Sequence, residues 1–211
     1  MAALVAVRFM VGGTQNFDLH DRISNGTIVA VVSFVEYPVV IITLMLASRR
    51  SGSGVLAYLG VDIPHWRHIA ITVAGLAAWV VLGDALALTL GGRDLDWSLE
   101  LERSARVDGS LFWLWLAVVV AAPIAEELLF RGFMFRGFVY TQRDAIPSIV
   151  LIFLIWSLLH VQYAWFGIAA IFVFGVLLGL VRWTTGSTTL TILLHMLYNL
   201  EALIETEFVL R

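Results

Sequence analysis

The sequence contains no cysteine and few charged residues, and both shortages exclude classes of function. Without cysteine, the chain has no disulfide framework, no thiol nucleophile and no cysteine-bound metal site. Charged residues make up 14% of the 211 positions and hydrophobic residues 60%, whereas soluble domains contain about 25% charged and about 45–50% apolar residues. This balance predicts an integral membrane protein. The formal net charge of −3 is too small to indicate a nucleic-acid partner.

Long apolar runs predict an all-α fold, a polytopic bundle of about six transmembrane helices. About 20 apolar residues are needed to span a bilayer as a helix. The runs that approach this length cover residues 27–47, 66–90, a stretch that begins at 111, 145–163, 165–183 and 188–205. Short connections follow the fourth and fifth runs, so we expect neighbouring helices to pack antiparallel.

The runs divide the chain into three parts. Residues 1–26 are expected to form an N-terminal arm at the membrane interface, and residues 27–110 two helices followed by a polar loop over 91–110. Residues 111–211 are expected to form a core of four helices. The loops on one side hold arginines but few acids, and basic loops favour the cytoplasmic side. We therefore expect a multi-pass protein of a bacterial cytoplasmic membrane with this side inside.

Three charged residues interrupt the third apolar run. Glu126, Glu127 and Arg131 would each cost roughly 2.5 kcal/mol or more at the bilayer centre if left unpaired. Glu127 and Arg131 stand four residues apart, the favourable order for a pair on one helical face. Glu126 lies about 100° around the helix and must face something else. The three residues therefore predict a functional site, although a purely stabilising ion cluster would also explain them.

Two later runs contribute histidines. His160 ends the fourth run, while His195 and Asn199 are four residues apart in the last and share a face. Each could be structural, because membrane bundles commonly use interhelical hydrogen bonds. At 1.5 Å per residue, Glu126 lies roughly 22 Å from one face of the membrane. His160 and Asn199 lie about 21 and 17 Å from the other face. Antiparallel packing would therefore bring all of them to a similar depth.

These residues, in this order, resemble the CAAX protease and bacteriocin-processing family (CPBP, also called Abi). The family comprises multi-pass intramembrane peptidases and includes the type II CAAX prenyl endopeptidases. The resemblance covers roughly residues 111–205, and it departs from the family at Trp156, where phenylalanine is usual. Its motifs are Glu126-Glu127-x-x-x-Arg131 with Phe130-Arg131-Gly132, then His160, then His195-x-x-x-Asn199.

The resemblance implies an intramembrane endopeptidase of the glutamic type, with residues 111–211 as its catalytic core. Glu126 would be the general base, and His160 would help to hold and activate a water molecule. His195 and Asn199 would donate hydrogen bonds to the oxyanion. A carboxyl group in apolar surroundings suits a base that works near neutral pH, and preorganised donors act strongly where water is excluded.

The resemblance also implies that Glu127 and Arg131 orient and tune the site. No cofactor is expected, and the expected partners are the lipid bilayer and a peptide or membrane-protein substrate.

Three other hypotheses remain open from the sequence. Glu126, His160 and His195 could form a zinc site with one open position; however, the sequence has no His-Glu-x-x-His motif and the ligands come from three helices. Glu36 and Asp84 are further acids within apolar runs, and such acids can mark the ion pathway of a transporter. Transporters usually show repeated halves, and none is visible. A non-enzymatic scaffold or immunity protein could also have kept the motifs.

Overall fold

The computed structural model describes residues 24–90 and 95–211, and every regular element in this part of the chain is a helix. The all-α bundle predicted from the apolar runs is confirmed. The predicted N-terminal arm lies outside the described residues except for its last three positions. The separate helices are α3 (Gly26–Ser48), η1 (Arg49–Ser51), α4 (Val55–Leu59), α5 (Trp66–Leu90), α6 (Asp96–Val107), α10 (Ala145–Leu158), α11 (Trp165–Thr185) and α12 (Thr188–Leu210).

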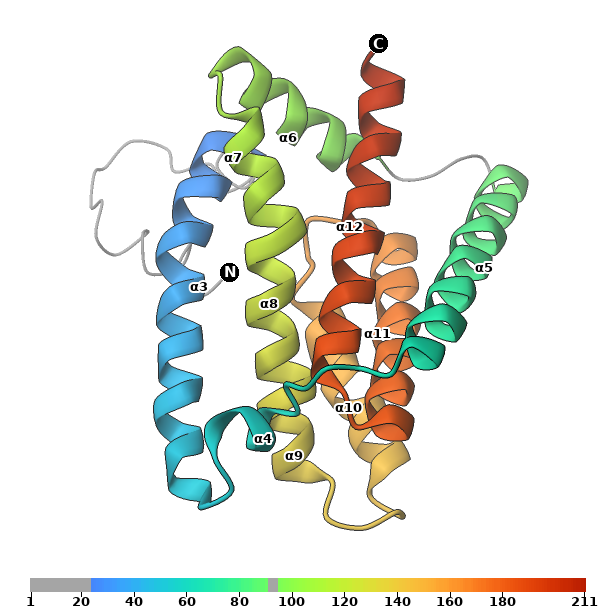
Figure 1. The fold of residues 1–211 in the computed structure, drawn as a ribbon. Helices are drawn as coiled ribbons and strands as arrows, with labels where there is room; N and C mark the ends of the chain where they lie inside the picture. The colour runs from blue at the N-terminus through green and yellow to red at the C-terminus, as the bar shows by residue number, and fades with distance from the viewer. Residues whose placement is uncertain (1–23, 91–94) are drawn as a thin grey trace.

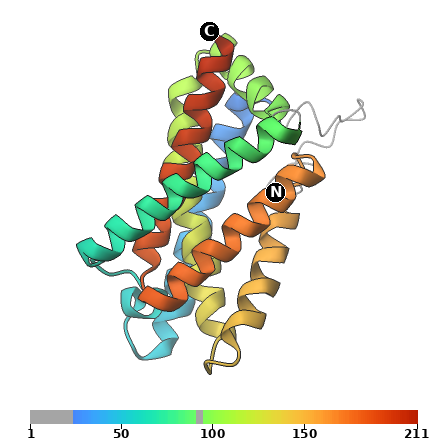
Figure 2. The ribbon, with the colours of Figure 1, turned by 90° about the vertical axis from the view of Figure 1, so that its right-hand side faces the viewer.

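Between α6 and α10 runs one composite helix, Leu111–Phe138, which lies at the centre of the bundle (Figure 1). Its successive parts are α7 (Leu111–Leu116), η2 (Ala117–Ala121), α8 (Ala122–Glu127), η3 (Leu128–Met134) and α9 (Phe135–Phe138). It contacts α3 on one side and α12 on the other, while α10 packs against α11. Helix α5 lies on the outside of the bundle and crosses α12 (Figure 2).

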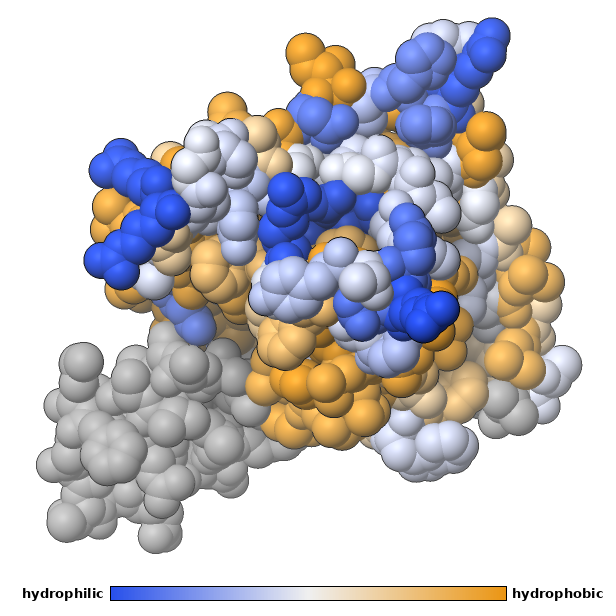
Figure 3. Space-filling view, turned by 90° about the horizontal axis from the view of Figure 1, so that it is seen from below, coloured by the Kyte–Doolittle hydropathy of each residue, from blue (hydrophilic) through white to orange (hydrophobic). Residues whose placement is uncertain are grey.

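Four of the described helices are long and apolar enough to cross a membrane, judged by length and composition. They are Gly26–Ser51, Trp66–Thr89, Leu111–Phe138 and Trp165–Thr185. Helix α10 is apolar but shorter, since it ends at Leu158 rather than at the predicted residue 163. Hydrophilic residues gather on the end of the bundle seen from below in Figure 3, and hydrophobic residues cover its flanks. This distribution suits a bundle surrounded by lipid.

The predicted polar loop over 91–110 is wrong for most of its length, because residues 96–107 form α6. Leu101 and Ala105 are four residues apart and buried, and they pack with Leu114 of the composite helix. An apolar position on each turn among charged residues makes an amphipathic helix. Most charged residues of this stretch therefore mark the exposed face of a helix, although Glu102 is buried.

The composite helix contains two stretches with π-helical hydrogen bonding. In the first, η2, the Ala122 N–H bonds to the carbonyl of Ala117, five residues back. The Val118 carbonyl would accept from the Ala122 N–H in an α-helix and from residue 123 in a π-helix. The Ala122 N–H is already used, and Pro123 has no N–H, so no backbone donor remains for this carbonyl. Asn199 of α12 fills the gap by donating from Nδ2 to this carbonyl at 2.9 Å. A buried carbonyl needs such a partner.

In the second stretch, η3, a side chain again replaces a backbone donor that is lost. The Phe135 N–H bonds to the carbonyl of Phe130, so the Arg131 carbonyl loses the donor that an α-helix would give it. Arg182 of α11 replaces this donor, with Nε 3.0 Å from the Arg131 oxygen. The two π-helical stretches thus bind the central helix to α12 and α11 through side chains.

Replacing Arg182 with methionine should lower the free energy of unfolding by about 1–3 kcal/mol, the cost of leaving a buried polar group unpaired. Arg182 is buried, and its Nη1 also donates to the Gly186 carbonyl at the end of α11. Thermal unfolding in detergent would measure the loss, with Arg143→Met as a control because Arg143 is exposed. Equal melting temperatures for the two variants would contradict this role.

Two glycines allow α11 to approach α10 closely. A Cβ on Gly179 would clash with Cε2 of Phe153, and one on Gly175 would lie 2.9 Å from Cε3 of Trp156. Neither contact is possible for a real side chain, so only glycine permits this spacing. The close approach also brings the Gly175 carbonyl within 3.2 Å of Arg131 Nη2.

Candidate active site

A buried ion pair forms the base of the site. Arg131 Nη1 donates to Glu127 Oε1 at 2.8 Å, and both side chains are fully buried. This is the pair that their spacing of four residues predicts. His195 of α12 places Nδ1 2.9 Å from the same carboxylate oxygen. Glu127 therefore joins the central helix to α12, and its charge is balanced where it is buried.

Two aromatic rings from α10 cover the guanidinium of Arg131. Its Cζ lies 4.0 Å from the centre of the Phe153 ring and 4.5 Å from a Trp156 ring. A desolvated cation–π contact is worth about 2 kcal/mol. These contacts, with the Gly175 carbonyl, help to compensate Arg131 for the loss of water.

Glu126 faces away from this ion pair, as expected from the angle between successive residues of a helix. Its side chain is partly exposed, and its Oε2 accepts a hydrogen bond from Trp156 Nε1 at 2.8 Å. The donor is a neutral N–H. The two adjacent glutamates therefore have different environments: Glu127 is fully buried beside Arg131 and His195, whereas the side chain of Glu126 is partly exposed.

His160 follows the end of α10 and is also partly exposed. Its Nδ1 lies 2.9 Å from the carbonyl oxygen of Trp156. A carbonyl can only accept, so Nδ1 must carry the hydrogen. The neutral ring then has an unprotonated Nε2, which can accept a hydrogen bond from water.

Trp156 is the point at which three helices meet. Its indole bonds to Glu126 of α8, and its rings lie 5.1 Å from the His160 ring and 5.6 Å from the His195 ring of α12. The structure thus brings three of the four residues implied as catalytic together around one side chain. The fourth, Asn199, lies one turn beyond His195 and uses one of its two amide N–H groups on the Val118 carbonyl.

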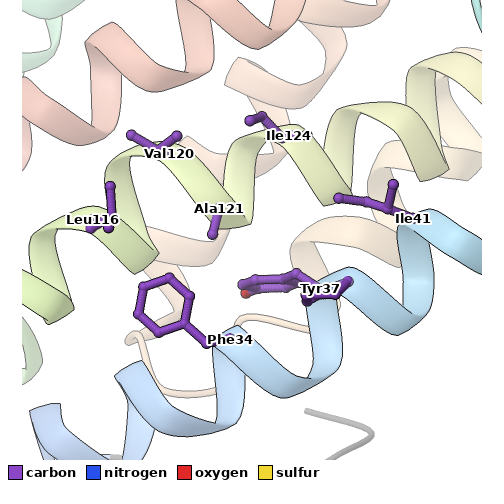
Figure 4. A pocket seen from close by; sticks show the side chains of 8 residues that line it. Phe34, Tyr37, Ile41, Leu116, Val120, Ala121 and Ile124 are labelled. Carbon is purple, nitrogen blue, oxygen red and sulfur yellow. The ribbon is translucent and has the colours of Figure 1, made fainter.

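An open apolar groove of about 300 Å³ runs between α3 and the composite helix (Figure 4). Tyr37 points into it from α3, and Glu126 is one of the charged groups near its phenol. The groove therefore lies near the partly exposed glutamate. Its lining residues are Phe34, Tyr37, Pro38, Ile41, Leu116, Val120, Ala121 and Ile124.

Over residues 24–90 and 95–211, no three or more His, Cys, Asp or Glu side chains are grouped so that they could hold a metal ion. The zinc hypothesis names Glu126, His160 and His195 as ligands. In the structure, each of them instead contacts the indole of Trp156. The Nδ1 atoms of the two histidines point to the Trp156 carbonyl and to Glu127.

Sequence reasoning missed three residues of this region. Trp156 was noted only as a departure from the family, although it stands four residues before His160 and so shares its helical face. Arg182 is a single charge near the end of an apolar run, which is a usable signal for a buried partner. Tyr37 carries no signal in the sequence, because its place beside Glu126 depends on how α3 packs.

Comparisons with known proteins agree with the motifs. Residues 108–200 match the family model described as type II CAAX prenyl endopeptidase Rce1-like. No curated protein and no solved structure matches the chain. The matched segment contains the composite helix, α10, α11 and the half of α12 that carries His195 and Asn199. Over residues 108–200, the chain is therefore similar to the Rce1-like type II CAAX prenyl endopeptidases.

Proposed function

We propose that this protein is an intramembrane endopeptidase of the glutamic type, in which Glu126 activates water to hydrolyse a peptide bond. The observation that carries the proposal is the contrast between two adjacent glutamates. Glu127 is fully buried against Arg131 and His195, whereas Glu126 is partly exposed and held by a neutral donor. A carboxylate held in this way has a second oxygen that can accept a proton from water.

The reaction begins with a water molecule between Glu126 and His160. Glu126 takes one proton of the water, while the unprotonated Nε2 of His160 accepts a hydrogen bond from it. The oxygen attacks the carbonyl carbon of the scissile bond and forms a tetrahedral intermediate. The carbon–nitrogen bond then breaks, and the proton on Glu126 passes to the leaving amine. The products are a carboxylic acid and an amine, and the carboxylate of Glu126 is restored.

His195 and Asn199 are proposed to stabilise the oxyanion of this intermediate. The Nδ1 of His195 is bonded to Glu127, so Nε2 is the nitrogen left to face substrate. When this nitrogen is protonated, it donates to the oxyanion with Glu127 as its counter-charge. Asn199 has one N–H that its bond to Val118 does not use. Donors fixed in advance cost no reorganisation during the reaction.

The proposed substrate is a peptide or membrane protein that reaches the site from the bilayer. The groove between α3 and the composite helix is lined mostly by apolar side chains, and Tyr37 on its wall lies near Glu126. It suits an apolar part of the substrate next to the scissile bond.

Cleavage of quenched peptides by the purified protein in detergent would test this function. The panel should contain matched peptides with and without a C-terminal lipid, each measured with and without a zinc chelator. Cleavage that continues in the chelator is expected. Activity lost to the chelator and restored by zinc would instead place the histidines around a metal ion, and a panel with no cleaved peptide would contradict the proposed peptidase.

A further inference from the structure

The indole of Trp156 has a role that aromatic packing does not explain. It is almost fully buried, at 2% exposed, yet its N–H points to the carboxylate of Glu126 across 2.8 Å. A phenylalanine ring in its place could still cover Arg131 and contact both histidines, but it would have no donor. We infer that Trp156 is a positioning residue, whose indole N–H fixes the orientation of the general base. This inference rests on the proposed function.

The indole is held firmly enough to fix another group. One face lies against the guanidinium of Arg131 at 4.5 Å, and its edge contacts involve His160 and His195. Gly175 packs so closely behind it that even a Cβ there would lie 2.9 Å from Cε3. Close packing of this kind leaves the ring few alternative rotamers. The direction of the N–H is therefore set by α10, α11 and α12 together.

A general base needs a carboxylate that is held in one orientation and has an oxygen left to take the proton. A fixed neutral donor meets both needs. The bond to Nε1 occupies Oε2 of Glu126, which leaves Oε1 as the oxygen that takes the proton from water. A cationic donor would neutralise much of the charge on this group, whereas the indole orients it and adds no charge. Without the donor, the side chain of Glu126 could rotate and point both oxygens away from His160.

Trp156 also fixes the second group that contacts the water. Its carbonyl accepts the Nδ1 hydrogen of His160 at 2.9 Å, so its side chain orients the carboxylate and its main chain orients the imidazole. A substitution of the side chain removes the first contact and keeps the second. Trp156→Phe therefore isolates the effect of the indole N–H.

Trp156→Phe should lower kcat by about 10- to 100-fold, the scale of a misplaced reacting group, with KM within about twofold. Trp79→Phe is the matched control: Trp79 lies on α5 and packs against the same hydrophobic cluster, but it makes none of the hydrogen bonds or ring contacts described above for the site. In a Glu126→Asp background, the further loss from Trp156→Phe should be small if the indole acts only through this carboxylate. Equal kcat for Trp156→Phe and Trp79→Phe would overturn the inference while leaving the peptidase function intact.

A second measurement does not depend on activity or on the folding of a Trp156 variant. The chain has eight tryptophans, so the indole N–H groups of the ¹⁵N-labelled protein give few NMR signals. Glu126→Ala should move the signal of a single buried indole upfield, because it removes that indole's acceptor. An unchanged indole spectrum would show that the bond does not form. If the wild-type protein cleaves no peptide while this signal still moves, the proposed function fails although the contact is real, and the positioning role falls with it.

Discussion

Glu126→Gln is expected to lower kcat/KM for peptide cleavage by a factor of about 10² to 10⁴, the usual contribution of a general base. The amide cannot take the proton of the attacking water, but it has nearly the same shape. Its oxygen can still accept the Trp156 N–H that Oε2 of Glu126 accepts at 2.8 Å. The loss should therefore appear in the chemical step. Single-turnover cleavage of the best peptide from the panel would measure it.

Stability provides the control for this variant. Glu126 is partly exposed and makes a hydrogen bond that glutamine can keep, so the melting temperature of Glu126→Gln should stay close to that of the wild-type protein. Glu100→Gln, on the exposed side of α6, removes the same charge away from the site and should keep full activity. Full activity in the Glu126 variant would eliminate the proposed mechanism.

Glu127→Ala, unlike Glu126→Gln, should lower the free energy of unfolding, by about 3–5 kcal/mol. This is the usual cost of removing one partner from a buried ion pair. Arg131 is fully buried, and it would lose the carboxylate that accepts its Nη1 hydrogen at 2.8 Å. His195 would lose the same oxygen as its Nδ1 partner. Both side chains would thus remain buried without the carboxylate acceptor, and Arg131 would keep only the Gly175 carbonyl.

Equilibrium unfolding in mixed micelles would compare this variant with Glu126→Ala, which removes the neighbouring carboxylate. The large loss of stability should occur only in Glu127→Ala. Replacing the pair together, as Glu127→Leu with Arg131→Met, should recover part of the stability, since buried pairs can often be exchanged for apolar residues. If Glu127→Ala melted at the wild-type temperature, the pair would not be a source of stability.

The sequence allowed the bundle and the ion pair to be predicted because both depend on local patterns. Runs of about 20 apolar residues indicate helices in lipid, and a spacing of four places Glu127 and Arg131 on one helical face. Helix α6 was missed because its charge content was considered without its period. Leu101 and Ala105 recur on one face and are buried, and this pattern was available in the sequence.

The remaining features depend on how separate helices are rotated against one another. The Trp156 N–H meets Glu126 only because α10 and α8 pack at one particular angle, and no local pattern encodes that angle. The bond from Arg182 to the Arg131 carbonyl also requires η3, since a regular α-helix would leave no vacant acceptor there. These contacts link residues 30 and 51 positions apart in the sequence.

The two π-helical stretches also make the length of the central helix matter. Each residue of an α-helix advances the side-chain direction by about 100°, and a π-helical turn accommodates one residue more than an α-helical turn. Deleting one residue from η2 could remove this extra residue and restore a regular α-helical turn, so Glu126 and Glu127 would keep roughly their direction relative to α7. Deleting one residue from a regular α-helical part, such as α7, would instead turn everything after it by about 100°. The site is thus sensitive to insertions and deletions that leave every one of its own residues in place.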